Sequence, residues 1–369
     1  MKSFKEEFAE IKRCISESGE FKREIEWVKQ QLADKPLVLY GAGIVGSCAA
    51  HLLMHYGISA TCFCDKNKTG IHNETKLPIV PPQSLLTDYS DANIIISSTI
   101  YVNEIGRELH LLGIAQERLF SRNFINFQSM TPEAVEPHLC GYERAYNLFD
   151  DDVSKQTLLG RLKCYLTPLP LIQTPFTIFS PDLLYFDPEI ITLSEDEIFV
   201  DGGMYVGDTA EQFYKISDGE YAHYYGFEPD KHNFATANKT LMEKPNMTLI
   251  PKGLWNCETL LGFTDGLASS SRLNEASGNI IDVTALDLYF SDMAPPTFIK
   301  MDIEGAELDA LRGAERTIRE HKPKLAICAY HKPEDAYALP ELAMGYRGDY
   351  KFYLRHYSNT SFDTVLYAV

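Results

Sequence analysis

The stretch Ile198-Phe199-Val200-Asp201-Gly202-Gly203-Met204-Tyr205-Val206-Gly207-Asp208 decides the fold of the second half of the chain. Its apolar residues predict a short buried strand, and a helical pattern from Thr209 to Ile216 follows the glycines. Glycines between a strand and a helix let the backbone approach a ligand, and free N–H groups at the helix start attract an anion. Tight turns also need glycine, so the loop alone does not establish a site.

Two later strands end in acidic side chains. The strand Tyr224 to Phe227 is followed by Glu228, where a carboxylate can accept both ribose hydroxyls of a nucleoside. The run Ile299-Lys300-Met301-Asp302-Ile303-Glu304-Gly305-Ala306-Glu307 brings a lysine and three acids to a second strand end. Ligands lie at this edge of an open α/β sheet, so the pattern predicts a nucleoside cofactor. A surface acid at Glu228 and acids at a helix start are the alternative interpretations.

Strands alternate with helices in two parts of the chain, which predicts two doubly wound, Rossmann-like α/β modules. We predict a helical segment at 1–35, a nucleotide-binding-like module at 36–125, a connector or helical cap at 126–195, and a second module at 196–369. The second module is expected to close with a hairpin of 351–356 and 364–369.

Composition limits the partners. The 369 residues include 52 acidic and 34 basic side chains, for a formal net charge of −18. This charge repels phosphates and anionic lipids, so we expect no nucleic-acid partner and no membrane insertion. Without a signal peptide pattern and with scattered cysteines, the sequence favours a reduced, cytoplasmic protein. The amphipathic N-terminal helices suit a homodimer contact.

A second glycine loop lies in the first module. Gly41, Gly43 and Gly46, with Asp65 at the end of the next strand, match the dinucleotide fingerprint and predict a second nucleotide there. The alternative is a degenerate module kept for docking. The module resembles the small nucleotide-sugar-binding-like domains that accompany surface-glycan enzymes.

Several stretches of the second module, taken in order, resemble the FkbM-type S-adenosylmethionine-dependent methyltransferases. They are Phe199-Val200-Asp201-Gly202-Gly203 with Gly207-Asp208, Gly226-Phe227-Glu228-Pro229-Asp230, Thr284-Ala285-Leu286-Asp287, Ile299 to Glu307, Leu311-Arg312-Gly313-Ala314 and Lys322-Pro323. The resemblance implies a class I methyltransferase domain at 196–369 with a seven-stranded mixed sheet. It also implies O-methylation of a sugar, glycan precursor or secondary metabolite.

The resemblance assigns S-adenosylmethionine to the loop after Val200. Asp201 and the glycines would hold the methionine end, Glu228 the ribose, and the segment around Gly253 the adenine. The implied cofactor-binding residues are Asp201, Gly202, Gly203, Tyr205, Gly207, Glu228, Pro229, Gly253, Leu254, Trp255 and Asp302. The family often has Gly-Ala-Asn where this chain has Gly-Gly-Met-Tyr, which indicates an altered methionine pocket at Tyr205.

A hydroxyl acceptor needs a base, and the candidates are His331, Asp302 and Glu304, with plain solvent exposure as the alternative for His331. Predicted substrate-binding residues are Lys300, Tyr330, Lys332, Arg355 and His356. Arg355 would grip an anionic acceptor through its guanidinium fork, unless it forms a structural ion pair. Residue types near His331 permit a divalent metal, but no spacing demands one, so none is assigned.

Two functions of other classes compete with methyl transfer. An NAD-dependent oxidoreductase or a noncatalytic nucleotide-binding protein would use the loop from Gly41 to Asp65. No residue in 66–125 is an obvious catalyst of hydride transfer.

Overall fold

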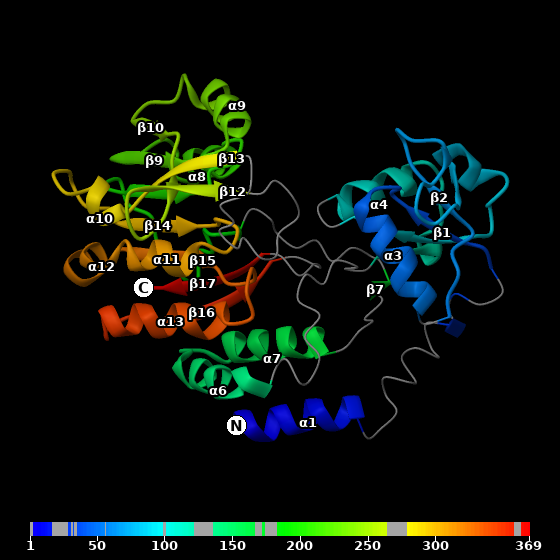
Figure 1. Cartoon of the computed structure of the whole chain (residues 1–369), viewed down its shortest axis with the longest axis horizontal. Coiled ribbons are helices and arrows are strands. Elements are labelled where there is room, and N and C mark those ends of the chain that lie inside the picture. Colours follow the sequence, from blue (N-terminus) through cyan, green and yellow to red (C-terminus); the bar gives the residue numbers. More distant parts are fainter. Residues whose placement is uncertain are drawn as a thin grey trace. The chain divides into compact units, whose positions relative to one another are not determined.

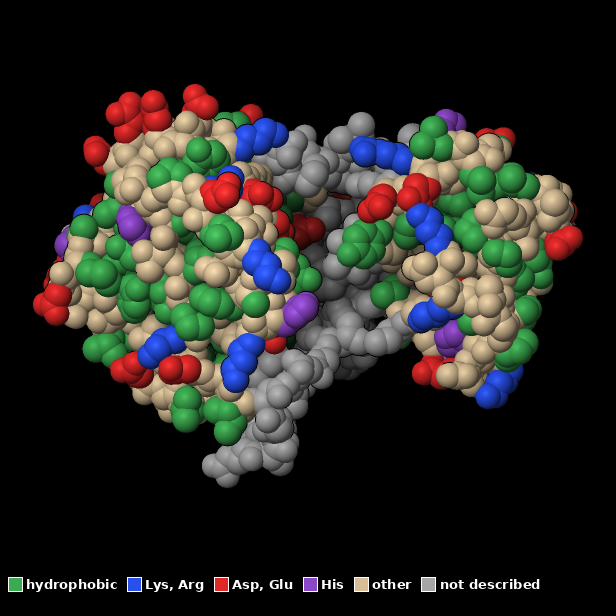
Figure 2. All heavy atoms as spheres, turned by 90° about the horizontal axis from the view of Figure 1, so that it is seen from above, with side chains coloured by type: hydrophobic (Ala, Val, Ile, Leu, Met, Phe, Trp, Pro, Cys, Tyr) green, Lys and Arg blue, Asp and Glu red, His purple; other side chains and the backbone are tan. Residues whose placement is uncertain are grey.

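The computed structural model describes residues 3–16, 29–30, 32, 35–55, 57–98, 101–121, 136–166, 172–173, 183–263, 279–357 and 363–369. The chain divides into two compact units (Figure 1): one is built mainly from residues 1–131, the other mainly from 132–160 and 180–357. Within the described ranges, no helix combines the length and hydropathy needed to cross a membrane. Acidic side chains are spread over the face drawn in Figure 2, together with scattered Lys and Arg.

The second unit is built on a seven-stranded mixed sheet, as predicted. Its strands are β8 (Ile198–Gly202), β9 (His223–Phe227), β10 (Met247–Ile250), β14 (Phe298–Met301), β15 (Lys324–Cys328), β16 (Phe352–His356) and β17 (Thr364–Ala368). They lie in the order β10-β9-β8-β14-β15-β17-β16. The first five are parallel, and β17 pairs antiparallel with both β15 and β16. The predicted closing hairpin is therefore confirmed.

Helices of this unit are α6 (Leu139–Leu148), α7 (Asp152–Leu166, which extends beyond it), α8 (Asp208–Ile216), α9 (Lys231–Leu241), α10 (Leu286–Tyr289), α11 (Glu307–Arg312), α12 (Glu315–His321) and α13 (Asp335–Tyr346). The pattern from Ala306 to Glu320 predicts one helix, but the structure has two. They part at Gly313, where a Cβ atom would lie 2.1 Å from the Trp255 carbonyl oxygen. A small sheet of β11 (Gly253–Leu254), β12 (Thr259–Phe263) and β13 (Asn279–Thr284) completes the unit.

Alternation along the strands divides the core into two layers. On one face, Phe199 and Phe298 pack against Phe213 of α8 and against Phe186, from the segment before β8. On the other face, Tyr225 packs against Phe290, which directly follows α10. Alternation also places Asp201 and Lys300 on the first face, two positions after Phe199 and Phe298.

The first unit has its own sheet, in the order β3-β4-β2-β1-β5-β6-β7. The strands are β1 (Leu37–Tyr40), β2 (Cys62–Cys64), β3 (Gly70–Ile71), β4 (Pro78–Val80), β5 (Asn93–Ile96), β6 (Leu119–Ser121) and β7 (Ile172–Gln173). The helices are α1 (Phe4–Ser16), α3 (Ile44–His55) and α4 (Val102–Leu111), with 3₁₀ turns at Pro82–Leu86 and Gln116–Arg118. Five neighbouring strands of this sheet, β4, β2, β1, β5 and β6, are parallel, which confirms the predicted α/β fold. The predicted continuation of the N-terminal helices to residue 32 falls largely outside the described residues.

Candidate functional site

Three loops meet at the carboxyl ends of β8, β9 and β14. From β8 the chain runs outward through β9 to β10, whereas β14 continues to β15 on the other side, so a topological switch point lies between β8 and β14. The Gly203 and Met204 N–H groups both donate to the Phe227 carbonyl oxygen, and the Asp302 N–H donates to the Gly202 carbonyl oxygen at 3.0 Å. These bonds fix the glycine loop against its two neighbours.

Gly203 cannot carry a side chain in this arrangement. Its φ is +73°, and a Cβ atom would lie 1.9 Å from the Asp302 carbonyl oxygen. Gly207, at φ +92°, is the N-cap of α8 and makes no side-chain cap hydrogen bond. The carboxylate of Asp208, the first residue of α8, accepts hydrogen bonds from the backbone N–H groups of Asp208 and Thr209, so the helix start is capped by the protein itself.

Glu228 is tied directly to the glycine loop. Its Oε2 accepts from the Tyr205 N–H at 3.0 Å, and its Oε1 accepts from the Asp230 N–H at 2.8 Å. The residue is 6% exposed, and burial raises the pKa of its carboxyl despite these two bonds. The Asn233 side chain is a third donor to this carboxylate, and a carboxylate has about four acceptor positions, so one remains for a ligand hydroxyl.

Asp201 and Lys300 form a buried pair beneath the loop. They are register partners on β8 and β14, and Lys300 Nζ lies 2.8 Å from Asp201 Oδ1. Tyr224 donates to Asp201 Oδ2 at 2.8 Å, and Lys300 Nζ also donates to the Gly202 and Gly203 carbonyl oxygens. Burial alone would lower the pKa of Lys300, but Asp201 more than offsets it, and the pKa is raised.

Both residues of this pair are engaged within the protein. All three N–H donors of the Lys300 ammonium are engaged, and its residue is 1% exposed. Asp201 is fully buried with both oxygens bonded. Lys300, predicted to bind substrate, and Asp201, predicted to hold the methionine end, are thus buried beneath the loop and bonded within the protein, and their roles toward a ligand stay predictions.

Asp302 receives side chains from three directions. The Tyr185 hydroxyl donates to its Oδ2 at 2.8 Å, Tyr330 donates to Oδ1 at 3.1 Å, and His331 Nε2 lies 3.5 Å from Oδ1. Burial alone would raise the pKa of Asp302, but the charges of His331 and Lys300 outweigh it and lower the pKa. Tyr185 was not predicted, because it comes from the connector, 117 residues away, and no spacing marks it.

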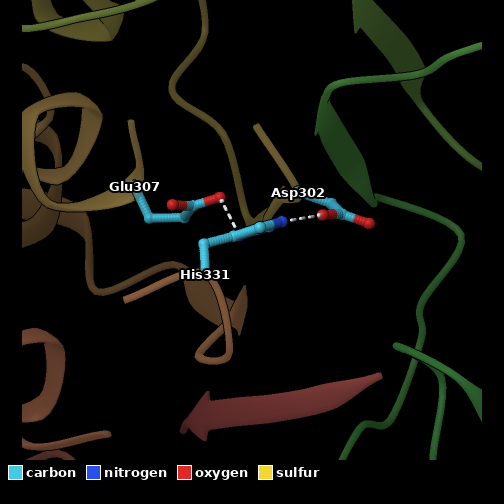
Figure 3. A group of neighbouring side chains, drawn as sticks. All are labelled: Asp302, Glu307 and His331. Carbon is cyan, nitrogen blue, oxygen red and sulfur yellow. Dashed lines mark ion pairs between the residues drawn. The ribbon is translucent and has the colours of Figure 1, made fainter. Parts of the chain in front are cut away.

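His331 lies between carboxylates on both sides (Figure 3). Figure 3 shows the imidazole between Glu307, whose Oε1 is 3.0 Å from Nδ1, and Asp302. Its Nε2 is also 3.7 Å from Glu304 Oε2. Glu307 is fully buried and accepts from the Ile303 N–H at 2.8 Å. The sequence marked Glu307 only as an acid near a helix start, since its distance from His331 along the chain hides their contact.

The carboxylates determine the charge of His331. Burial lowers the pKa of the imidazole, but Glu307 and then Asp302 more than offset it and raise the pKa to about 10. The side chain is 5% exposed, so the alternative of plain solvent exposure does not apply. An imidazole that already carries its proton accepts no other, so this arrangement by itself does not provide the general base predicted at His331.

The segment expected near the adenine lies partly beside the loop. Leu254 Cδ1 is 2.7 Å from where a Cβ of Gly202 would stand, and Pro229 Cγ is 3.5 Å from the corresponding position on Gly253. The Trp255 N–H donates to the Thr284 carbonyl oxygen, while its own carbonyl faces Gly313.

Two of the remaining residues predicted to contact the acceptor, Arg355 and His356, are engaged within the protein. Arg355 binds Asp151 Oδ2 at 2.6 Å and the Ser154 hydroxyl at 3.0 Å, the structural ion pair that was the alternative interpretation. His356 Nδ1 lies 2.9 Å from the Thr364 hydroxyl. For Lys332 only the backbone N–H is bonded, to Asp335 Oδ2 at 2.6 Å; its side chain lies beside Gly305, and its contact with the acceptor stays a prediction.

Replacing Asp151 with Asn should lower stability by about 1–2 kcal/mol, because a partly buried, charge-assisted pair is lost. Burial raises the pKa of Asp151, but bonds from Arg355 and Ser154 outweigh it and lower the pKa to about 2. The native contribution is thus fully present above the unfolded pKa near 4 and disappears as pH falls through 2. Urea unfolding at pH 7 and pH 2.5 measures this. A difference between wild type and Asp151→Asn that does not shrink at the lower pH would contradict it.

The glycine loop of the first unit is bonded to its own acid. Asp65 Oδ2 accepts from the Ala42 N–H, and Oδ1 accepts from the Asn67 and Lys68 N–H groups. Gly41 has φ +111°, and a Cβ on Gly46 would lie 2.0 Å from the Gly41 carbonyl oxygen, whereas nothing lies within 4 Å of that position on Gly43. The geometry requires two of the three glycines without any ligand, so the second nucleotide stays a prediction.

The second unit thus has the fold predicted for a class I methyltransferase, with its loops gathered at the switch point. Residues 201–347 match the family model described as the Methyltransferase FkbM domain. This match includes the loop, Glu228, and the run from Lys300 to Glu307.

One solved structure supports the fold, and two others are reported for their similarity alone. A crystal structure described as methyltransferase FkbM from Methylobacillus flagellatus KT aligns with a TM-score of 0.63 and 23% identity, covering 96% of this chain and 99% of that one. An rRNA methylase from Streptococcus thermophilus has a TM-score of 0.32 and 17% identity over 48% of this chain and 87% of that one. Aeropyrum pernix fibrillarin with natively bound S-adenosyl-L-methionine has a TM-score of 0.32 and 13% identity over 49% and 70%. No curated protein matches the chain.

Proposed function

We propose that the second unit is an S-adenosylmethionine-dependent O-methyltransferase that acts on a small hydroxyl-bearing acceptor such as a sugar, a glycan precursor or a secondary metabolite. The observation that carries the proposal is the bond between the Tyr205 N–H and Glu228. It joins the glycine loop to the carboxylate in a stretch that matches a methyltransferase family.

The residues fit this cofactor by their chemistry. The buried Glu228 carboxylate, held by the N–H groups of Tyr205 and Asp230, is the acceptor that we assign to the ribose of the cofactor. When bound, S-adenosylmethionine supplies an activated methyl group on a positively charged sulfur.

The chain's own residues would then mainly position the acceptor. They would hold the acceptor hydroxyl in line with the methyl group and take up its proton, for which we assign the Glu304 carboxylate, whose pKa is raised by burial. Tyr330 bonds to Asp302, and Glu304 lies beside His331. We propose that these two side chains contact the acceptor. Identification of an O-methylated product by mass spectrometry, from labelled cofactor and a metabolite extract, tests the acceptor class. An N-methylated product would contradict it.

The cofactor is tested through Glu228. Glu228→Gln should weaken S-adenosylmethionine binding by roughly 10- to 150-fold, since hydrogen bonds to a charged group contribute about 1.5–3 kcal/mol. Isothermal titration of the full chain measures this change. Glu220→Gln, an exposed acid before β9, is the control and should bind like wild type. If the wild-type protein did not bind S-adenosylmethionine, or if wild type and Glu228→Gln bound it with equal affinity, the proposal would be wrong.

A further inference from the structure

Three side chains at the carboxyl ends of β14 and β15 have the spacing of a metal site. Asp302, Glu307 and His331 each offer one ligand atom, and these atoms lie within 4.8 Å of one another. They come from the loop after β14, the first turn of α11 and the loop after β15 (Figure 3). Donors bound to one divalent cation at about 2.1–2.4 Å are at most roughly 4.2–4.8 Å apart, so the spacing is compatible with a single ion.

Two polar atoms of this cluster are left unsatisfied. Glu307 Oε2 and His331 Nδ1 are buried and have no hydrogen-bond partner among the described residues. His331 Nδ1 forms an ion pair with Glu307 Oε1 at 3.0 Å, but the contact lacks the geometry of a normal hydrogen bond. Buried polar atoms are nearly always bonded, and an unsatisfied one costs about 1–3 kcal/mol. A bound cation would displace the proton of His331 and coordinate the atoms that the protein leaves without a hydrogen bond.

The charge of the cluster also favours a cation. Asp302 and Glu307 both form ion pairs with the single imidazole of His331, and Glu304 brings a third carboxylate within 3.7 Å of it. These four side chains therefore carry more negative than positive charge. The side chain of His331 is almost fully buried, and that of Glu307 is fully buried. In such surroundings a negative surplus is stabilised by a divalent ion.

We propose that Asp302, Glu307 and His331 bind one divalent cation at the carboxyl edge of β14 and β15. Two hard carboxylate oxygens among three ligands favour Mg²⁺ or Mn²⁺ over softer metals. The cation would hold an acceptor oxygen next to the cofactor loop and lower the pKa of its hydroxyl. This use rests on the proposed function, whereas binding of the ion does not.

Mn²⁺ is the probe, because electron paramagnetic resonance measures the free ion directly. Chelator-treated full-length protein should bind one Mn²⁺ per chain, in competition with Mg²⁺. Glu307→Gln and Asp302→Asn should each weaken binding by at least the roughly 10- to 100-fold seen when only an outer partner of a ligand is changed. The control is Glu315→Gln on α12, whose carboxylate pairs with Arg319 at the surface, and it should bind like wild type.

Three results would overturn the site: no saturable Mn²⁺ binding, binding that survives both ligand variants, or equal loss in Glu315→Gln. Circular dichroism melts show whether each variant is folded, and Asp302→Asn serves if Glu307→Gln is not. Titration with S-adenosylmethionine separates the two proposals. Cofactor binding without Mn²⁺ binding would refute only the proposed metal site. Mn²⁺ binding without cofactor binding would refute only the proposed methyltransferase function.

Discussion

Gly203→Ala should abolish S-adenosylmethionine binding and lower the free energy of unfolding by at least about 2 kcal/mol. The new Cβ would stand 1.9 Å from the Asp302 carbonyl oxygen, and alanine would have to adopt a φ of +73°. The loops after β8 and β14 must therefore separate, which displaces the backbone that carries the Tyr205 N–H toward Glu228. Urea unfolding and isothermal titration measure the two effects.

Gly345→Ala is the matched control. Gly345 lies in α13, has no positive φ, and nothing lies within 4 Å of the position of its Cβ. Alanine there should raise stability by about 0.5–1 kcal/mol and leave cofactor binding unchanged. If Gly203→Ala behaved like Gly345→Ala, the close approach of the two loops would be refuted.

Lys300→Met should destabilise the protein by about 3–5 kcal/mol, because it leaves the Asp201 carboxylate buried without its partner. Methionine occupies a similar volume but donates nothing to Asp201 or to the Gly202 and Gly203 carbonyl oxygens. The glycine loop loses the contacts that hold it from below, so cofactor affinity should fall as well. Chemical unfolding at pH 7 measures the stability change.

Two variants make this prediction specific. Lys252→Met removes a lysine that pairs with Glu258 at the surface, and it should change stability by less than about 1 kcal/mol. The double variant Lys300→Met with Asp201→Asn removes the stranded charge and should be more stable than Lys300→Met alone. Equal losses from Lys300→Met and Lys252→Met would show that the buried pair is not important for stability.

The strands of both units were predictable because buried parallel strands are short apolar runs separated by helical patterns. Ile198 to Val200 and Phe298 to Met301 are clear examples, and Glu228 and Asp302 follow from strand ends. The break at Gly313 was not predictable, because it depends on the approach of the Trp255 carbonyl. The three-stranded sheet of β11, β12 and β13 was missed for a similar reason: its strands pair across a long insertion.

The sequence by itself determined the α/β class, the glycine loop and the acids of the second unit. Hydrophobic periodicity and glycine positions are local properties of the chain, so the secondary structure that they favour can be predicted from the sequence. Only the tertiary structure decided what those side chains do. Parallel register turned Lys300 toward Asp201, and folding brought Tyr185 to Asp302 across 117 residues and Glu307 to His331. Their protonation and their suitability for a cation depend on burial and on charges a few ångströms away, which no one-dimensional spacing records.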